Sequence, residues 1–158
     1  MLSELGDVNP NQADTKYGRT PLMWAAEHGY SWVVKTFLER GDVNPDQADT
    51  FYGQTPLSLA ATNGHWKVVQ MLLEREDVNP NQVDTEFGQT PLSWAAEYGH
   101  SEVVDVLLER GDVNPSQADT VHGRTPLSLA ATNGHWEVVR MLFERRDINP
   151  DQAETFLG

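Results

Sequence analysis

Cysteine is absent from the 158-residue chain, and cationic side chains are scarce. The lack of cysteine excludes disulfides, thiolate nucleophiles and cysteine-ligated zinc, and it is typical of a reducing compartment, so we expect a cytoplasmic protein. Lysine and arginine number 11 against 24 aspartates and glutamates, which gives a formal net charge of −13. Because this charge repels phosphate backbones and anionic lipids, we expect neither nucleic acid nor a membrane as a partner.

Long apolar runs are also missing. The N-terminal stretch MLSELGDVNP has no basic region, and nowhere does an apolar run reach the roughly 18 residues of a membrane-spanning helix. We therefore expect a soluble chain, with neither a signal peptide nor a membrane span. Its length allows about one domain with a buried core.

One short segment occurs four times in the chain. GRTPLMWAA begins at Gly18, and GQTPLSLAA, GQTPLSWAA and GRTPLSLAA begin at Gly53, Gly88 and Gly123, each 35 residues after the one before. A fixed period between about 20 and 50 residues predicts a stack of similar units. We expect a single domain over residues 1–158, made of a partial repeat and first finger at 1–17 and four repeats at 18–52, 53–87, 88–122 and 123–157.

Each unit contains the signals for two short helices and a long turn. Thr55 is a favourable N-cap and Pro56 suits the first helical position. Gly64 tolerates the left-handed conformation that ends a helix. In the following segment WKVVQMLLER the apolar residues fall on one face of a second helix. The remaining DVNPDQADTFYG has turn chemistry, and its Pro45 argues against a central strand, so we expect a projecting loop or hairpin.

This pattern resembles the ankyrin repeat over essentially the whole chain. The resemblance implies an all-α repeat solenoid, with a helix-turn-helix and a projecting hairpin or loop in each repeat. The amino-acid sequence of the loops is also similar to that in the ankyrin arrays of fungal intracellular receptors of the nucleotide-binding, NLR-like type. The residues that match the family, repeated in register in the other units, are Gly53, Thr55, Pro56, Leu57, Ala60, Ala61, Gly64, His65, Val69, Leu72, Leu73, Asp77, Val78 and Asn79.

The sequence departs from the family pattern in two ways. The unit is longer than the usual length of about 33 residues, with the extra residues in the NPDQADT segment, which leaves the bend of the fingers open. The histidine of the family's TPLH motif is replaced by Ser58, Ser93 and Ser128, and by Met23 in the first unit. We expect the inter-repeat hydrogen bonds attributed to that histidine to be absent or rebuilt.

The ends of the chain lack the polar caps that protect terminal repeats. Aligning Gly6 with Gly41 places LSEL at the end of a second helix, so we expect a fragment of a longer array. We also expect end-to-end self-stacking through the uncapped terminal repeats.

No constellation of residues indicates catalysis. The repeated serines have no paired histidine and acid in a recognisable motif, and no phosphate-binding loop, dinucleotide fingerprint or zinc spacing occurs. His65, His100 and His135 recur at one position of the helix-helix turn, which favours a structural role. We expect no enzyme activity, no catalytic residue and no cofactor.

The loop DVNPDQAD resembles the opening of a calcium site at Asp42, Asn44 and Asp46. The sixth and twelfth positions of that motif require Gly and Glu, but Gln47 and Gly53 stand there. We expect no metal site, and we expect these polar side chains to hold the turn through local hydrogen bonds.

The positions that vary between copies cluster beside the framework glycine and at the end of the first helix. In the family these positions line the concave groove that holds a protein or peptide, so the resemblance implies a contact surface there. Several are aromatic or arginine, residue types that anchor interfaces. The predicted partner-binding residues are Lys16, Tyr17, Arg19, His28, Phe51, Tyr52, Gln54, Asn63, Glu86, Phe87, Gln89, Tyr98, Val121, His122, Arg124 and Asn133.

Trp32 stands apart from this set, on the side of the second helix that we expect to face water. Lys67, Glu102 and Glu137 take its place in the other copies. A preceding repeat could cover it, or it could form a second contact.

Our leading hypothesis is a non-enzymatic binding module, the ligand-sensing part of a larger signalling or immune-type receptor. The alternative is a designed or consensus structural array without a natural partner. A third class, an enzyme or metal protein, would require a ligand or metal at the Asp-rich loops.

Overall fold

The computed structural model describes residues 8–145, and these residues contain eight helices and no strand. The stretch 2–5, for which the end of a second helix was predicted, lies outside the described residues. The helices are α2 (Pro21–His28), α3 (Ser31–Leu38), α4 (Pro56–Thr62), α5 (Trp66–Leu73), α6 (Pro91–Glu97), α7 (Ser101–Glu109), α8 (Pro126–Thr132) and α9 (Trp136–Glu144).

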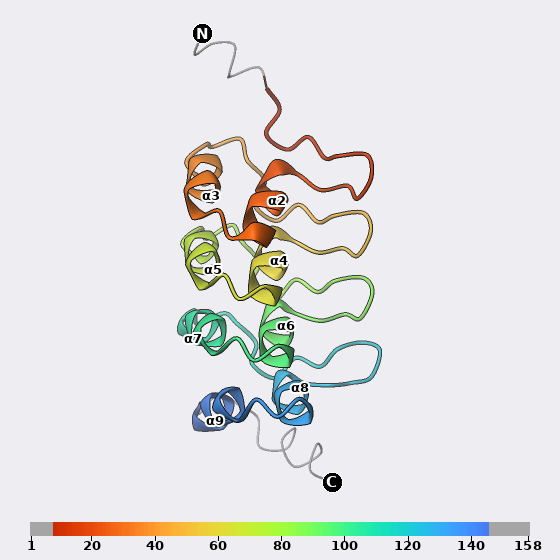
Figure 1. Ribbon diagram of the computed structural model, residues 1–158, viewed down its shortest axis with the longest axis vertical. Helices are drawn as coiled ribbons and strands as arrows, with labels where there is room; N and C mark the ends of the chain where they lie inside the picture. Colours follow the sequence, from red (N-terminus) through yellow and green to blue (C-terminus); the bar gives the residue numbers. More distant parts are fainter. Residues whose placement is uncertain (1–7, 146–158) are drawn as a thin grey trace.

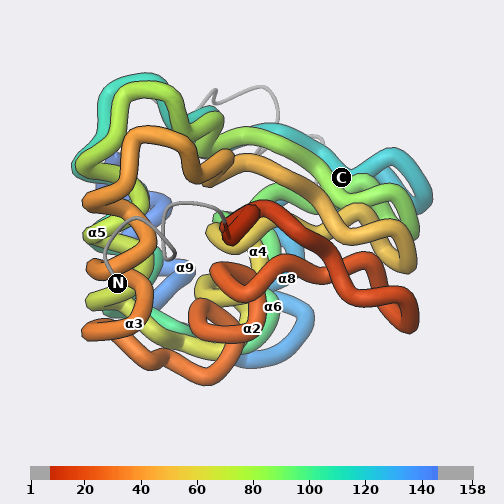
Figure 2. The backbone as a smooth tube through the Cα atoms, turned by 90° about the horizontal axis from the view of Figure 1, so that it is seen from above, coloured from red at the N-terminus to blue at the C-terminus, as the bar shows by residue number. Residues whose placement is uncertain are grey.

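The helices form two parallel columns with loops projecting to one side (Figure 1). The first helices α2, α4, α6 and α8 pack on one another in chain order, and each pairs with the second helix of its own unit. The connecting loops stack behind one another on the side away from α3 and α5 (Figure 2). This is the predicted all-α repeat solenoid. We call the projecting segments 9–19, 44–54, 79–89 and 114–124 the fingers.

The first helices begin where the sequence predicts. The side chains of Thr20, Thr55, Thr90 and Thr125 each accept a hydrogen bond from the backbone N–H three residues later, and proline takes the first helical position. Because each cap satisfies an otherwise unpaired N–H, it fixes the start of the helix. Two residues after each cap lies a buried leucine, Leu22, Leu57, Leu92 or Leu127.

The turn between the two helices also joins neighbouring repeats. Gly64 has φ +76°, a conformation that glycine favours, and a Cβ there would lie 2.8 Å from Nδ1 of His100. Nε2 of His100 donates a hydrogen bond of 2.9 Å to the carbonyl of Thr62 in the preceding repeat. His65 and His135 make the same bond to the carbonyls of Glu27 and Glu97. The histidines are structural, as predicted, and each one links its repeat to the preceding repeat.

The serines that replace the TPLH histidine act within their own repeat. Ser93 Oγ lies 3.0 Å from Oγ1 of Thr90, and Ser128 Oγ accepts a hydrogen bond from the backbone N–H of Thr125. Ser58 Oγ is buried without a hydrogen-bond partner among the described residues. Ser93 and Ser128 therefore support the starts of their own helices, and none of the three serine side chains links repeats within the described residues.

The lengthened segment at the base of the fingers links one repeat to the next. Asn11 Oδ1 accepts a 2.7 Å hydrogen bond from the backbone N–H of Asn44, and Asn81 makes the equivalent bond to Asn114. At the fingertips the backbone N–H of Thr85 donates to the carbonyl of Tyr52 over 2.8 Å. The extra residues therefore hold successive fingers side by side.

Candidate partner-binding face

Each fingertip is folded around a carboxylate, which is half-buried at Asp14 and buried at Asp49, Asp84 and Asp119. Asp49 Oδ1 accepts hydrogen bonds from the backbone N–H groups of Tyr52, Gly53 and Gln54. Asp14, Asp84 and Asp119 fold the other tips in the same way. The variable residues just before each framework glycine are thus held in a fixed position.

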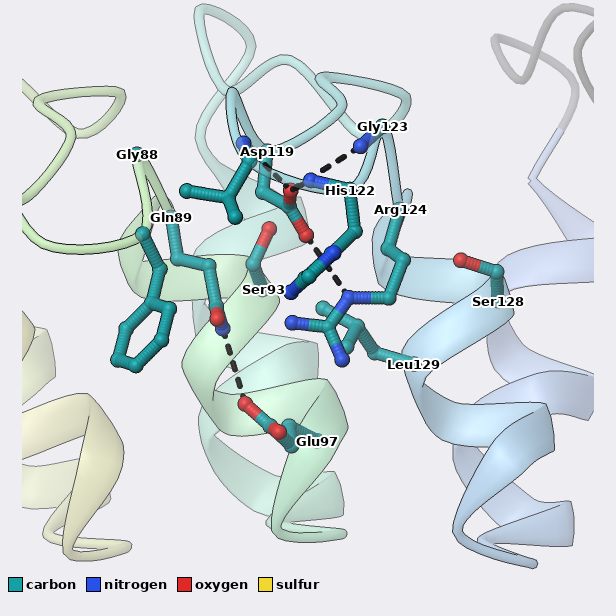
Figure 3. A network of polar contacts seen from close by, with 12 residues as sticks. Gly88, Gln89, Ser93, Glu97, Asp119, His122, Gly123, Arg124, Ser128 and Leu129 are labelled. Atoms are coloured by element: carbon teal, nitrogen blue, oxygen red, sulfur yellow. Dashed lines mark hydrogen bonds and ion pairs between the residues drawn. The ribbon is translucent and has the colours of Figure 1, made fainter.

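At two of these tips, those of Asp14 and Asp119, the surroundings favour the ionised carboxylate. Burial by itself raises the pKa of Asp119, but hydrogen bonds from the His122 N–H, the Arg124 side chain and the Val121 N–H outweigh it, and the pKa lies below its usual value (Figure 3). The backbone hydrogen bond from Tyr17 is the largest cause that lowers the pKa of Asp14. Asp14 and Asp119 therefore keep their charge at neutral pH.

The second oxygen of each tip carboxylate has a partner that alternates along the array. In the first and third repeats an indole N–H donates to it, from Trp24 to Asp14 over 2.9 Å and from Trp94 to Asp84 over 2.8 Å. In the second and fourth repeats leucine replaces tryptophan, and an arginine Nε donates to the tip carboxylate instead. Arg19 of the preceding finger reaches Asp49 over 3.2 Å, whereas Arg124 reaches Asp119 of its own finger over 3.0 Å. The two-repeat period of the sequence therefore corresponds to two ways of binding the same carboxylate.

Rings line the first and third repeats from fingertip to helix end. We call these sets the aromatic ladders: Tyr17, Trp24, His28 and Tyr30 in the first repeat, and Phe87, Trp94, Tyr98 and His100 in the third. Neighbouring ring centroids within each ladder are 5.5–6.3 Å apart. In the second and fourth repeats Leu59, Asn63, Leu129 and Asn133 stand at the two central ladder positions.

A carboxylate stands beside each ladder, at Glu27 and Glu97. Arg19 binds both oxygens of Glu27 at 2.9 Å, and its guanidinium lies 4.9 Å from the centroid of Trp24. In the third repeat Gln89 replaces this arginine, and its amide donates to Glu97 over 3.0 Å (Figure 3). The two ladders therefore each contain four neighbouring rings, but they differ in local charge.

The structure sorts the predicted contact residues by exposure. Gln89 is only 1% exposed, so it has almost no surface to offer a partner, and it positions Glu97 instead. The Arg19 side chain is 10% exposed and turned toward Glu27 and Asp49. Tyr17, Gln54, Phe87 and Arg124 are half-buried. Exposed positions are Lys16, His28, Phe51, Tyr52, Asn63, Glu86, Tyr98, Val121, His122 and Asn133.

Sequence reasoning missed Trp24 and Trp94 as members of this face. A signal for the tryptophans was present: they alternate with leucine in step with the two-repeat period. We call the surface formed by the fingertips and the first helices α2, α4, α6 and α8 the inner face.

Within residues 8–145, no group of three or more histidine, aspartate or glutamate side chains has a geometry that could hold a metal ion. None of the helices in that range has the length and apolar character needed to cross a membrane.

Paired helices in register, stacked histidine turns and carboxylate-folded fingertips define a helical repeat solenoid with a fixed framework and a variable inner face. The family model described as ankyrin repeats (three copies) matches residues 1–84 and again residues 76–153, so the chain belongs to the ankyrin-repeat family. Ankyrin repeats are generally protein–protein interaction modules and are typically non-enzymatic. No curated protein matches the chain significantly.

Proposed function

We propose that residues 1–158 form one domain that binds a protein or peptide on the inner face, as the ligand-sensing part of a larger cytoplasmic signalling or immune-type receptor. The single observation that carries the proposal is the pair of aromatic ladders, which place rings on the inner face at every second repeat. Tyr98 is 53% exposed and the His28 side chain is 50% exposed. Exposed rings on a rigid support are the usual anchors of a protein interface.

The framework gives this face the stiffness that binding without rearrangement needs. The tip carboxylates and the histidine turns join each repeat to the next, so a partner meets a surface that is already ordered. A pre-ordered surface loses less conformational entropy on binding. The net charge of −13 favours a partner with a basic or neutral contact surface over an acidic one.

The alternative, a consensus array without a natural partner, would leave its copies interchangeable at solvent-facing positions. The copies differ most at such positions: the tip pairs read Lys16-Tyr17, Phe51-Tyr52, Glu86-Phe87 and Val121-His122. This difference favours the binding module.

The experiment replaces ladder residues with the residue found at the equivalent position of the other repeats. His28→Asn and Tyr98→Asn remove a ring from each ladder and insert the residue found at Asn63 and Asn133. Those asparagines donate 2.8 Å hydrogen bonds to the helix carbonyl four residues earlier, so the helix end stays satisfied. A partner isolated with the wild-type chain should bind the double variant about tenfold or more weakly, with an unchanged unfolding midpoint.

Trp136→Ser is the matched control, because it removes an exposed ring from the second-helix column. It should bind the partner like the wild type. Equal affinity of the double variant and the wild type would place the contact away from the ladders and refute the proposal.

A further inference from the structure

An open groove of about 370 Å³ lies between α3 and α5, in the column of second helices. We call it the outer groove. Trp32 and Trp66 line it together with Met71, Lys35 and Lys67. None of these residues belongs to the inner face or to the predicted contact set, so the outer groove is a separate surface.

The outer groove is particular to this pair of helices. It requires a tryptophan at the second position of one helix and a tryptophan at the first position of the next. Trp32 corresponds to Lys67, Glu102 and Glu137 in the later copies, whereas Trp66 corresponds to Ser101 in α7 and recurs as Trp136 in α9. The repeated framework therefore explains neither Trp32 nor the pairing of the two rings.

Trp32 is exposed to an unusual degree, with 78% of its surface accessible. A tryptophan buries a large area when it is covered, and such residues dominate the binding energy of protein interfaces. The groove thus offers an apolar contact surface for leucine or phenylalanine side chains of a partner.

The charge of the outer groove is opposite to that of the whole protein. Lys35 Nζ lies 5.2 Å from the Trp32 ring centroid, and Lys67 Nζ lies 5.5 Å from that of Trp66. These are two of the three lysines in a chain of net charge −13. Neither ammonium group forms an ion pair within the described part of the chain, and no carboxylate lines the groove.

A second hollow of about 490 Å³ continues the groove and shares Lys35 and Met71 with it. Leu38 adds apolar surface there, Glu39 and Glu74 carry carboxylates, and the guanidinium of Arg75 is paired with Asp77. The tryptophan end is therefore the cationic end, and the apolar floor extends along both helices.

We propose that the outer groove binds an acidic apolar segment of a partner protein, in which leucine or phenylalanine is flanked by aspartate or glutamate. The apolar side chain covers Trp32, Trp66 and Met71, and the flanking carboxylates pair with Lys35 and Lys67. Because an anionic ligand faces repulsion from the rest of the protein, local pairing with these lysines selects the groove.

The test titrates the 158-residue chain with the peptide acetyl-Glu-Leu-Phe-Glu-amide and follows the five indole N–H signals by NMR. The signals of Trp32 and Trp66 should shift, and the peptide acetyl-Gln-Leu-Phe-Gln-amide should bind about fivefold or more weakly because it lacks the charges. Trp66→Ser should weaken binding about tenfold. Serine is the residue at the equivalent positions 31 and 101.

Lys67→Glu should weaken binding about fivefold or more. Glutamate is the residue at the equivalent positions 102 and 137.

Two controls separate this site from the inner face. Trp136→Ser removes a tryptophan that is 70% exposed and has its own neighbouring cation, Arg140, but does not line the outer groove, and it should leave the affinity unchanged. The His28→Asn/Tyr98→Asn double variant should also bind the peptide normally, so failure here is distinguishable from failure of the proposed function.

Equal binding of the two peptides would refute the acidic partner, and unshifted Trp32 and Trp66 signals would refute the site. Wild-type affinity in Trp66→Ser would also overturn the proposal. Concentration-dependent sedimentation that is lost in Trp66→Ser would show that a second copy of the chain covers the groove, and this result too would overturn it.

Discussion

The indole N–H of Trp94 donates a 2.8 Å hydrogen bond to Oδ2 of Asp84, while Oδ1 of the same carboxylate accepts the backbone N–H groups of Glu86 and Phe87. One carboxylate therefore connects the ring in the middle of the ladder to the tip that carries the variable residues. The inner face therefore cannot lose Trp94 without affecting the fingertip that Asp84 folds.

Replacing Trp94 with leucine should destabilise the protein, and arginine at position 89 should restore part of the loss. Trp94→Leu removes a hydrogen bond to a buried carboxylate, a loss of about 1.5–3 kcal/mol in the free energy of unfolding. Trp94→Leu/Gln89→Arg recreates the fourth repeat, where Leu129 accompanies Arg124 and Arg124 binds Asp119. Urea unfolding of the single and double variants measures the recovery.

The single variant Gln89→Arg completes this cycle. In the wild type Trp94 already satisfies Asp84, so the added arginine should contribute little by itself. A double variant no more stable than Trp94→Leu would show that tryptophan and arginine are not alternative partners of the carboxylate.

Gly64 and Gly134 should respond differently to alanine. Both have positive φ, at +76° and +74°, so each Gly→Ala change costs about 1–2 kcal/mol in backbone strain. At Gly64 the new Cβ would also lie 2.8 Å from Nδ1 of His100, whereas no described residue lies within 4 Å of such an atom at Gly134. We expect Gly64→Ala to lower the free energy of unfolding by about 1 kcal/mol or more beyond Gly134→Ala, because the histidine must move. Equal losses in urea unfolding would contradict the proposed role of His100.

The parts of this molecule that follow from local chemistry were predictable from the sequence. Thr55 and Pro56 are local signals for the start of a helix, and Gly64 is a local signal for its end. The positions of the helix pairs could therefore be predicted from the sequence. The burial of Gln89 could not, because it depends on the finger and helices that enclose it.

The same limit explains what was missed at the candidate site. The bond from Arg19 to Asp49 joins residues 30 positions apart, and no rule of spacing within one repeat reveals it. The alternation of tryptophan with leucine was visible, but its reason lies in the partner of a tip carboxylate that looks identical in every copy. Exposure of the tip residues followed from their variability, whereas the inward turn of Arg19 did not.

Asp46→Asn should stabilise the protein at neutral pH. Asp46 Oδ2 accepts the backbone N–H of Asn79, but its Oδ1 is buried without a hydrogen-bond partner. Burial, followed by the neighbouring charge of Asp77, raises the pKa of Asp46. At the equivalent positions Asn11 and Asn81 keep the accepting oxygen and donate Nδ2–H to the carbonyl 31 residues later.

The asparagine variant should therefore gain one hydrogen bond, about 0.5–1.5 kcal/mol in the free energy of unfolding at pH 7. Because the folded-state pKa of Asp46 is raised, its ionisation destabilises the wild type as pH rises through that pKa. The advantage of the variant should shrink as pH falls through the same range. A constant advantage across an acid titration of stability would show that the charge of Asp46 is irrelevant.

Asp119→Asn should have the opposite pH dependence. The Asp119 side chain is fully buried and accepts hydrogen bonds from three backbone N–H groups and from Arg124 Nε. An asparagine has a single accepting oxygen, and its amide group would face one of these donors. We expect a loss of about 1.5–3 kcal/mol at pH 7, the usual cost at a buried charged group. Asp112→Asn, at an exposed carboxylate paired with Arg110, is the matched control and should cost under about 1 kcal/mol.

The sign of the pH dependence follows from the lowered pKa of Asp119. A carboxyl whose folded-state pKa is depressed adds stability that is fully present above its unfolded pKa of about 3.9 and is lost as pH falls through the folded value. The gap between wild type and Asp119→Asn should thus be full at pH 7 and should narrow below about pH 4. Urea unfolding at pH 7 and at several acidic values measures this gap, and a gap that widens on acidification would contradict the assignment. Because the carboxylate positions Val121 and His122, the variant should also weaken any partner that contacts this tip, even where the array remains folded.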